Sequence, residues 1–467
     1  MKNYLILRAL GGKKSHDYTV GYRLASRENL FHGTGSYLAW LPPAGIFITI
    51  ACYGAFLFAH AINIPFADDI LDVLQVINGL VNSDDAATKA DLLFAQHNDH
   101  RTLSSRLIYY LVFSLEGEVN FRSLTFVANF ALVLIFALWY LSVRDHSARW
   151  LILLPVALIL FQLRAYGITL WSMAAFAYFY VYLYGFASLY CLGKKGTFSF
   201  VAALVLASLA TFTLASGQMV WFIGLAALLH QAVVLKRRSI VLPVLWFVAT
   251  VFVMLAWRAG LETPNSMSHV LGLLWETPVH HLFYYFALLG SAVSESSVVA
   301  AVISGAVMVL VLAGSTVYHF RVDNLQLELF GWFICLSVFA MVLGRAPYSD
   351  IEYALSSRYS FPSILLLSNT FLIVAYRADR RFLKLVPAVV LLALIYCFTS
   401  YRLYSVALQP YMEKRVDNFN RKNYWVFGKP KKETNPIVQE SISMAVYAPP
   451  ARPFPQPKIA LVPAVEE

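Results

Sequence analysis

The chain has 467 residues, of which 59% are hydrophobic and only 13% are charged. Because about a quarter of the residues of a typical soluble domain are charged, this composition excludes an ordinary water-soluble domain. The formal net charge of +10 does not indicate a nucleic-acid partner, because the basic residues lie mainly in short connections between apolar runs and in the two tails. Such a distribution is typical of membrane-topology signals.

The apolar runs predict an all-α polytopic membrane protein. The first 37 residues form a basic tail, expected in the cytoplasm, and residues 38–400 form the transmembrane domain. A helix needs about 20 mostly apolar residues to cross a bilayer. We expect about eleven spans, at 38–62, 122–143, 150–164, 171–192, 198–215, 219–235, 239–257, 297–318, 328–344, 361–377 and 384–400.

Alternate connections between these runs differ in their content of Lys and Arg. The basic connections are 144–149, 193–195, 236–238, 319–321 and 376–384. Excess positive charge marks the cytoplasmic side, so the other connections, above all the long loop 63–121, are expected on the periplasmic side. An odd number of spans also places the basic tail 401–467 outside, and one miscounted span would reverse that assignment.

The carboxy-terminal tail changes character along its length. Residues 401–432 are basic and aromatic, which predicts an interfacial helix, whereas the Pro-rich stretch beyond Asn435 is expected to be poorly ordered. The four cysteines (Cys52, Cys191, Cys335 and Cys397) all lie within apolar runs without a short paired spacing. They are expected to be small buried side chains rather than disulfide partners or zinc ligands.

The loop 63–121 is acidic and begins with PFADDILDVLQVINGLV. Asp68 or Asp69 is placed to cap a short helix whose apolar face, from Ile70 to Leu80, predicts an amphipathic helix on the membrane surface. Two adjacent carboxylates repel each other, so one of them is expected to have a raised pKa, which suits a proton acceptor. A plain helix cap beside a solvated neighbour is the alternative interpretation.

The next polar cluster is FAQHNDHRTLSSRL at 94–107. His97 and His100 are expected on one helical face, with Asp99 between them in the chain, and either a metal site or neutral polar contacts would explain the histidines. Their spacing is not a recognised ligand signature, which favours polar contacts. Arg101 and Arg106 are suited to hold a phosphate by paired hydrogen bonds near the membrane surface.

A third cluster, GRAPYSDIEYALSSRYSFPS at 344–363, contains Arg345, Arg358 and Tyr359. Its charged groups either pair and snorkel at the membrane interface or bind an anionic lipid headgroup. Gln218 lies in the small-residue turn TLASGQMVW, which has room for a ligand. The loop 258–296 has amphipathic character and is interpreted as a further surface helix.

The stretches PFADDI, FAQHNDHR, LASGQMVWFIGL and GRAPYSDIEYALSSRY, in this order and on one face, resemble the type C glycosyltransferase superfamily. Members are integral-membrane enzymes that use polyprenyl-phosphate-linked sugars. The resemblance implies that Asp68 or Asp69 orients or deprotonates the acceptor hydroxyl. Some relatives carry Asp-Glu where this chain has Asp-Asp, which leaves the catalytic carboxylate open.

The same resemblance implies that Arg358 and Arg345 hold the donor phosphate, with Arg101 assisting. The remaining pocket candidates are His97, Asp99, His100, Gln218 and Tyr359. No metal ligands and no cofactor are assigned, and a divalent cation remains an option. The chain lacks a large soluble outer domain, which favours a single sugar over a multi-sugar donor.

The leading hypothesis is a bacterial inner-membrane glycosyltransferase with its active site on the periplasmic side. It would transfer a sugar from polyprenyl phosphate, with inversion, to a hydroxyl of a glycan, of a protein such as pilin, or of a lipid of the cell envelope. The alternative is a transporter or lipid flippase, which would require charged residues deep within spans and matching interrupted helices. A structural scaffold is the third interpretation. Membrane lipid is expected as a partner, and nucleic acid is not.

Overall fold

The computed structural model describes residues 40–262, 267–321, 325–378, 380–424, 426 and 431–459. Its contacts divide the chain into Met1–Leu41 and Pro42–Glu467, and the description that follows concerns the second unit. The basic tail 1–37 lies outside the described residues.

Helices occupy all eleven positions at which spans are expected. Eight of them are long and apolar enough to cross a bilayer: α1 (Leu41–His60), α5 (Phe121–Val143), α8 (Ser172–Leu192), α10 with its flanking turns η3 and η4 (Ala215–Val234), α11 (Val241–Arg258), α14 (Val298–His319), α15 with η5 (Gln326–Tyr348) and α18 (Val386–Asn420). The other three, α6 (Arg149–Leu160), α9 (Thr197–Thr211) and α16 (Phe361–Arg377), are shorter. The chain is therefore a helical multi-pass membrane protein, with eight candidate spans in the part that the structure describes.

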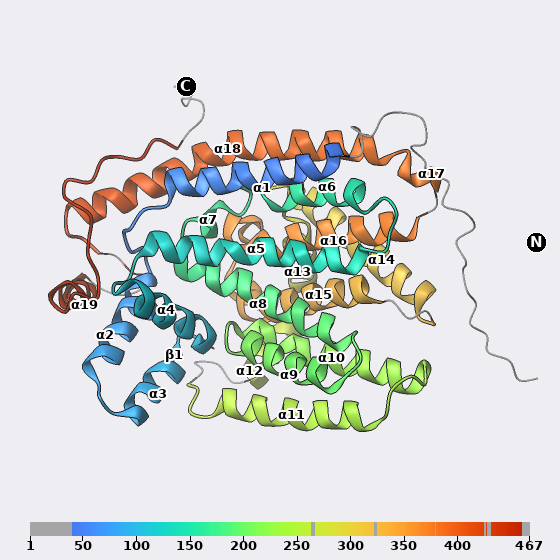
Figure 1. The fold of residues 1–467 in the computed structure, drawn as a ribbon, viewed down its shortest axis with the longest axis horizontal. Coiled ribbons are helices and arrows are strands. Elements are labelled where there is room, and N and C mark those ends of the chain that lie inside the picture. The colour runs from blue at the N-terminus through green and yellow to red at the C-terminus, as the bar shows by residue number, and fades with distance from the viewer. Residues whose placement is uncertain are drawn as a thin grey trace, which may run out of the picture. The chain divides into compact units, whose positions relative to one another are not determined.

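The remaining elements are short. They are η2 (Asp69–Leu74), α2 (Gln75–Asn82), α3 (Ala86–Phe94), β1 (Gln96–His97), β2 (His100–Arg101), α4 (Leu103–Glu116), α7 (Tyr166–Thr169), α12 (Met267–Glu276), α13 (Pro278–Gly290), η6 (Ile351–Leu355), η7 (Ser357–Tyr359), α17 (Arg380–Leu383) and α19 (Lys431–Ser443). In Figure 1 the long helices α1, α5 and α8 run lengthwise, and α2, α3, α4 and α19 gather beyond one end of them.

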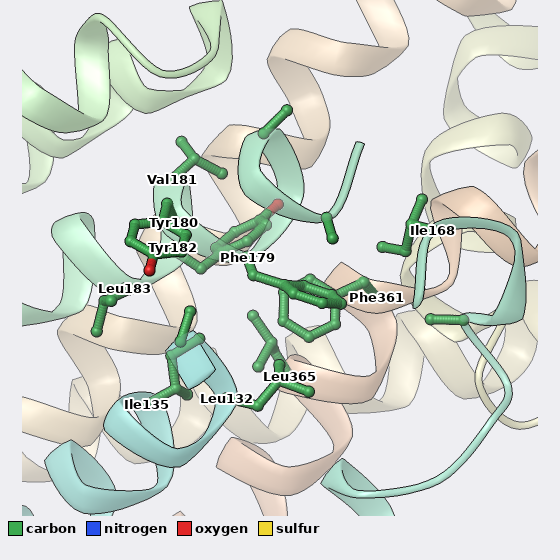
Figure 2. Packing of buried hydrophobic residues seen from close by; sticks show 14 of the residues in the cluster. Leu132, Ile135, Ile168, Phe179, Tyr180, Val181, Tyr182, Leu183, Phe361 and Leu365 are labelled. Carbon is green, nitrogen blue, oxygen red and sulfur yellow. The ribbon is translucent and has the colours of Figure 1, made fainter. Parts of the chain in front are cut away.

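Helix α8 forms the centre of the bundle. Of its 18-residue apolar window 72% is buried, against 17% for α11. The Phe186 ring stacks on Phe330 of α15 with centroids 4.3 Å apart, and the Phe179 ring contacts Phe361 of α16 at 4.6 Å; Figure 2 shows Phe179 and Phe361 side by side. Helix α11 instead exposes large apolar side chains such as Phe252, as lipid-facing helices do.

The second helix of the loop 258–296 differs from the predicted surface helix. Its α13 packs closely against α14, where a Cβ atom added at Gly290 would lie 1.8 Å from the carbonyl oxygen of Ala301. Since only glycine permits this approach, α13 is a packed part of the bundle.

The helix predicted on the membrane surface at the start of the first loop also packs inside the protein. It consists of the π-helix η2 continued by α2, and the side chains of Ile70, Leu74, Ile77 and Leu80 are all buried. Its contacts include α4, α8 and α19. The prediction of an amphipathic helix is thus correct in its pattern, but protein rather than lipid covers the apolar face.

The carboxy-terminal tail is helical in the part where a helix is predicted, and beyond Asn435 it is more ordered than predicted. Helix α18 continues without a break through residues 401–420, and α19 packs against η2 and α2. The Val119 N–H donates to the carbonyl of Val446 at 2.7 Å, and the Tyr447 hydroxyl donates to the carbonyl of Asn63 at 2.8 Å. The described part of the tail beyond Asn435, up to Ile459, is therefore packed against the first loop.

Candidate functional site

A cavity of about 710 Å³ opens where the first loop, the start of α8 and the connection between α15 and α16 meet. Its lining residues are Asp68, Gln96, His97, Asn98, Asp99, His100, Ile168, Trp171, Met173, Ala174, Ala177, Tyr178, Leu214, Glu262, Arg345, Arg358 and Tyr359. Three polar clusters that are far apart in the chain therefore share one cavity. Of the ten predicted site residues, Asp69, Arg101 and Gln218 are not in its lining.

Asp68 and Asp69 face different surroundings. Asp68 lines the cavity, and its Oδ2 lies 4.0 Å from Nε2 of His97. Asp69 is fully buried, and its carboxylate accepts hydrogen bonds from the backbone N–H groups of Phe66 and Met173, both at 2.9 Å. Asp69 thus joins the first loop to α8, and neither carboxylate makes the predicted helix cap on η2: Asp68, at the cap position, forms no such bond.

One carboxyl of the pair has the raised pKa that the sequence predicts. Burial raises the pKa of Asp69 to about 7, whereas the charge of Arg415 and the two hydrogen bonds lower it. The charge of Asp68 adds the smallest contribution. Loss of solvation, rather than the expected repulsion between neighbours, is therefore the main cause.

Asp72, which is not in the cavity lining, links Arg106 to His97. Its fully buried Oδ1 accepts hydrogen bonds from Arg106 Nη2 and Thr102 Oγ1, both at 2.8 Å. The same oxygen lies 3.8 Å from Nδ1 of His97. Burial lowers the pKa of His97, but the carboxylates of Asp68 and Asp72 outweigh it and raise the pKa overall. His97 is thereby held between a buried carboxylate and the carboxylate that lines the cavity.

Sequence reasoning missed the role of Asp72 and gave Arg106 a different one. A signal was present, because Asp72 follows Asp68 by four residues and this spacing places two side chains on one face of a helix. Arg106 was expected to bind a phosphate, but its guanidinium donates to Asp72 and to the backbone carbonyl of Ala95 at 2.5 Å. Arg106 therefore neutralises the buried carboxylate of Asp72.

The histidines lie on a β-hairpin rather than on the predicted helical face. Strands β1 and β2 pair His97 with His100 across a turn of Asn98 and Asp99, and Asn98 has a φ of +50°, which asparagine tolerates better than most residues. Burial lowers the pKa of His100 to about 4, so its imidazole is neutral at pH 7. Among the described residues, no three His, Cys, Asp or Glu side chains are grouped to hold a metal ion.

Two arginines also line the cavity. Arg345 ends α15, and Arg358 lies in η7 with its guanidinium 4.8 Å from the ring centroid of Tyr359 and 5.4 Å from that of Tyr353. Arg358 also donates a hydrogen bond to the Tyr353 hydroxyl. Within the described ranges, neither arginine has a carboxylate within ion-pair distance. Both positive charges are available to an anion in the cavity.

Two predicted site residues are held elsewhere. The Arg101 side chain donates to the backbone carbonyls of Phe94, Trp257 and Ala259, which fixes the hairpin to the end of α11. Gln218 ends η3, apart from the cavity lining. Arg101 therefore positions the hairpin, and nothing in the geometry points it at the cavity.

Buried Arg164 holds the segment around Arg358 in place through hydrogen bonds. Its Nη2 donates to the carbonyl of Leu355 at 2.7 Å and its Nε to that of Ser291 at 3.2 Å. The hydroxyl of Ser360 donates to the carbonyl of Arg164 at 3.2 Å. These bonds fix the segment that carries Arg358 against the bundle.

One cavity is thus lined by a carboxylate, a histidine and two arginines. A carboxylate within reach of a hydroxyl can accept its proton, and paired guanidiniums can stabilise a phosphate as negative charge grows on it. The chain matches no protein-family model, no curated protein and no solved structure.

Proposed function

We propose that this protein is a membrane glycosyltransferase that transfers a single sugar from a polyprenyl-phosphate donor to an acceptor hydroxyl. The proposal rests on one observation: Asp68, His97, Arg345 and Arg358 line the same cavity. As expected from the sequence, the protein would lie in a bacterial inner membrane with this cavity on the periplasmic side.

In the proposed reaction, Arg345 and Arg358 bind the donor phosphate through charge-assisted hydrogen bonds. The acceptor oxygen attacks the anomeric carbon, and its proton passes to the carboxylate of Asp68. The bond between the anomeric carbon and the phosphate oxygen breaks, and its electron pair leaves with the prenyl phosphate. One direct displacement inverts the anomeric configuration. The arginines stabilise the phosphate as its charge increases.

The size and lining of the cavity suit such a substrate. A volume of about 710 Å³ lies within the range of small-molecule sites and accommodates a sugar phosphate together with an acceptor hydroxyl. Trp171, Met173 and Leu214 add apolar surface to the lining, against which a sugar ring or the first prenyl unit can pack.

The geometry gives less support to the transporter alternative. The first two turns of α8, from Met173 to Tyr178, line the cavity, whereas Val181 and Phe186 further along the helix are buried. A transport path would have to pass this packed centre. A transferase requires access only from one end and sideways from the lipid.

The Asp68→Asn variant tests the proposal. It should lower transfer from a labelled prenyl-phosphate sugar by about 10²–10⁴-fold, because the acceptor loses its proton acceptor. Release of prenyl phosphate from purified protein is the readout. Asp84→Asn, an exposed carboxylate of the same loop, is the matched control and should retain activity. Equal activity of both variants would remove Asp68 from the mechanism.

A further inference from the structure

A second cavity, of about 540 Å³, lies at the opposite end of the bundle. It is formed by the connections that follow α5 and α8, by the segment between η4 and α11, and by facing parts of α14 and α15. Tyr190, in the last turn of α8, lines this cavity, whereas Met173, in the first turn, lines the candidate site. The length of α8 separates the two cavities.

The lining of this cavity is strongly basic. Arg144, Lys194, Lys195, Arg237 and Arg238 contribute to it, and Asp145 is the one acidic residue in it among those described. Asp145 is 89% exposed and lies 3.9 Å from Arg144, so it offsets little of the charge.

The basic groups are positioned by the fold. The Arg238 guanidinium donates to the backbone carbonyls of Leu192 and Lys194, which ties the end of α8 to the segment before α11. The Lys194 ammonium lies 4.4 Å from the ring centroid of Tyr190. Basic side chains from three separate connections therefore line the same cavity.

The lining also includes apolar side chains: Ile223 and Ala227 of α10, and Trp332 of α15. Helix α10 exposes Phe222 and Leu229 on its outer surface. The N-cap residue of α15, Leu325, and its first residue, Gln326, also line the cavity, and the N-terminus of a helix favours an anion.

We propose that this cavity binds the phosphate headgroup of an anionic phospholipid, with an acyl chain lying along the exposed apolar face of α10. Clusters of Lys and Arg beside membrane helices attract such headgroups, and arginine and lysine both bind phosphate. A role as topology signals alone requires only that basic residues lie in the connections on one side of the membrane, and does not require them to line one cavity. Arg321 and Lys384, in other connections of this end, are absent from its lining.

Lipid titration of the purified full-length protein, read by native mass spectrometry, tests the assignment. The wild-type protein should retain dioleoylphosphatidylglycerol at least about tenfold more tightly than dioleoylphosphatidylcholine, because only the first carries net negative charge. The double variant Lys194→Gln/Lys195→Gln should weaken binding of the anionic lipid about tenfold. Arg321→Gln/Lys384→Gln removes the same charge outside the cavity and should leave it unchanged.

Three results would overturn the proposal. Equal retention of the two lipids would remove the anionic headgroup, and equal loss in the two double variants would reduce the effect to general surface charge. Inorganic phosphate that displaces the lipid from the wild-type protein at equal concentration would show that the acyl chain contributes nothing. The measurement does not depend on glycosyl transfer, so either proposal can fail alone.

Discussion

Asp68 and Asp69 are neighbours in the chain, but the fold gives them separate surroundings. Asp69 is buried and held by the N–H groups of Phe66 and Met173, whereas Asp68 lines the cavity beside His97. The sequence could predict a raised pKa in this pair because like charges lie close together. It could not predict which carboxyl is buried, because that depends on contacts with α8, about a hundred residues away.

The buried carboxyl predicts a dependence of stability on pH. The pKa of Asp69 is about 7 in the folded protein and 3.8 in its reference state, so the folded state binds the proton more tightly. The stabilising contribution of the protonated group is complete below about pH 4 and is lost as pH rises through 7. The melting temperature of the wild-type protein should therefore fall over this interval relative to that of Asp69→Asn.

Melting in detergent at pH 4.5, 6 and 7.5 measures this difference. Asp84→Asn is the control, since its exposed carboxyl should follow the wild-type curve throughout. Parallel curves for Asp69→Asn and the wild-type protein would show that Asp69 does not titrate between these limits.

At the scale of elements, the apolar runs predicted the positions of the helices well, because burial in lipid or protein requires continuous apolar sequence. The pattern was less informative where polar elements pack on one another. A helix was predicted within residues 401–432, but not its continuity with the preceding span as α18, and the order beyond Asn435, including most of α19, was missed because its Pro-rich composition is typical of exposed segments. The hairpin of β1 and β2 was missed because two-residue strands leave no periodicity to read.

Helix α19 should be required for the stability of the first loop. Val438 is fully buried in α19, the helix that packs on η2 and α2. The Val438→Asp variant buries an unpaired carboxylate and should lower the melting temperature by several degrees. Ile442→Asp, on the same helix at a side chain that is 39% exposed, should have a much smaller effect. Equal melting temperatures of the two variants would contradict the packing of α19 against the loop.

At the scale of the whole bundle, the two ends differ in chemistry. One end combines carboxylates, histidines and two arginines in a single cavity, and the other is a basic hollow. The sequence indicated that the first set would lie on one face, because the clusters alternate with apolar runs. The resemblance implied that Arg345 and Arg358 act together with Asp68 or Asp69, and Asp68 does share a cavity with both arginines. The sequence could not show that Arg101 would be bound by backbone carbonyls.

The most direct test of the proposed function is an experimental structure of the Asp68→Asn variant with a bound prenyl-phosphate sugar, because this variant should bind the donor without consuming it. The proposal predicts the phosphate within hydrogen-bond distance of the guanidiniums of Arg345 and Arg358, with the anomeric carbon turned toward residue 68. A donor bound in another part of the molecule, or with its phosphate away from both arginines, would contradict it.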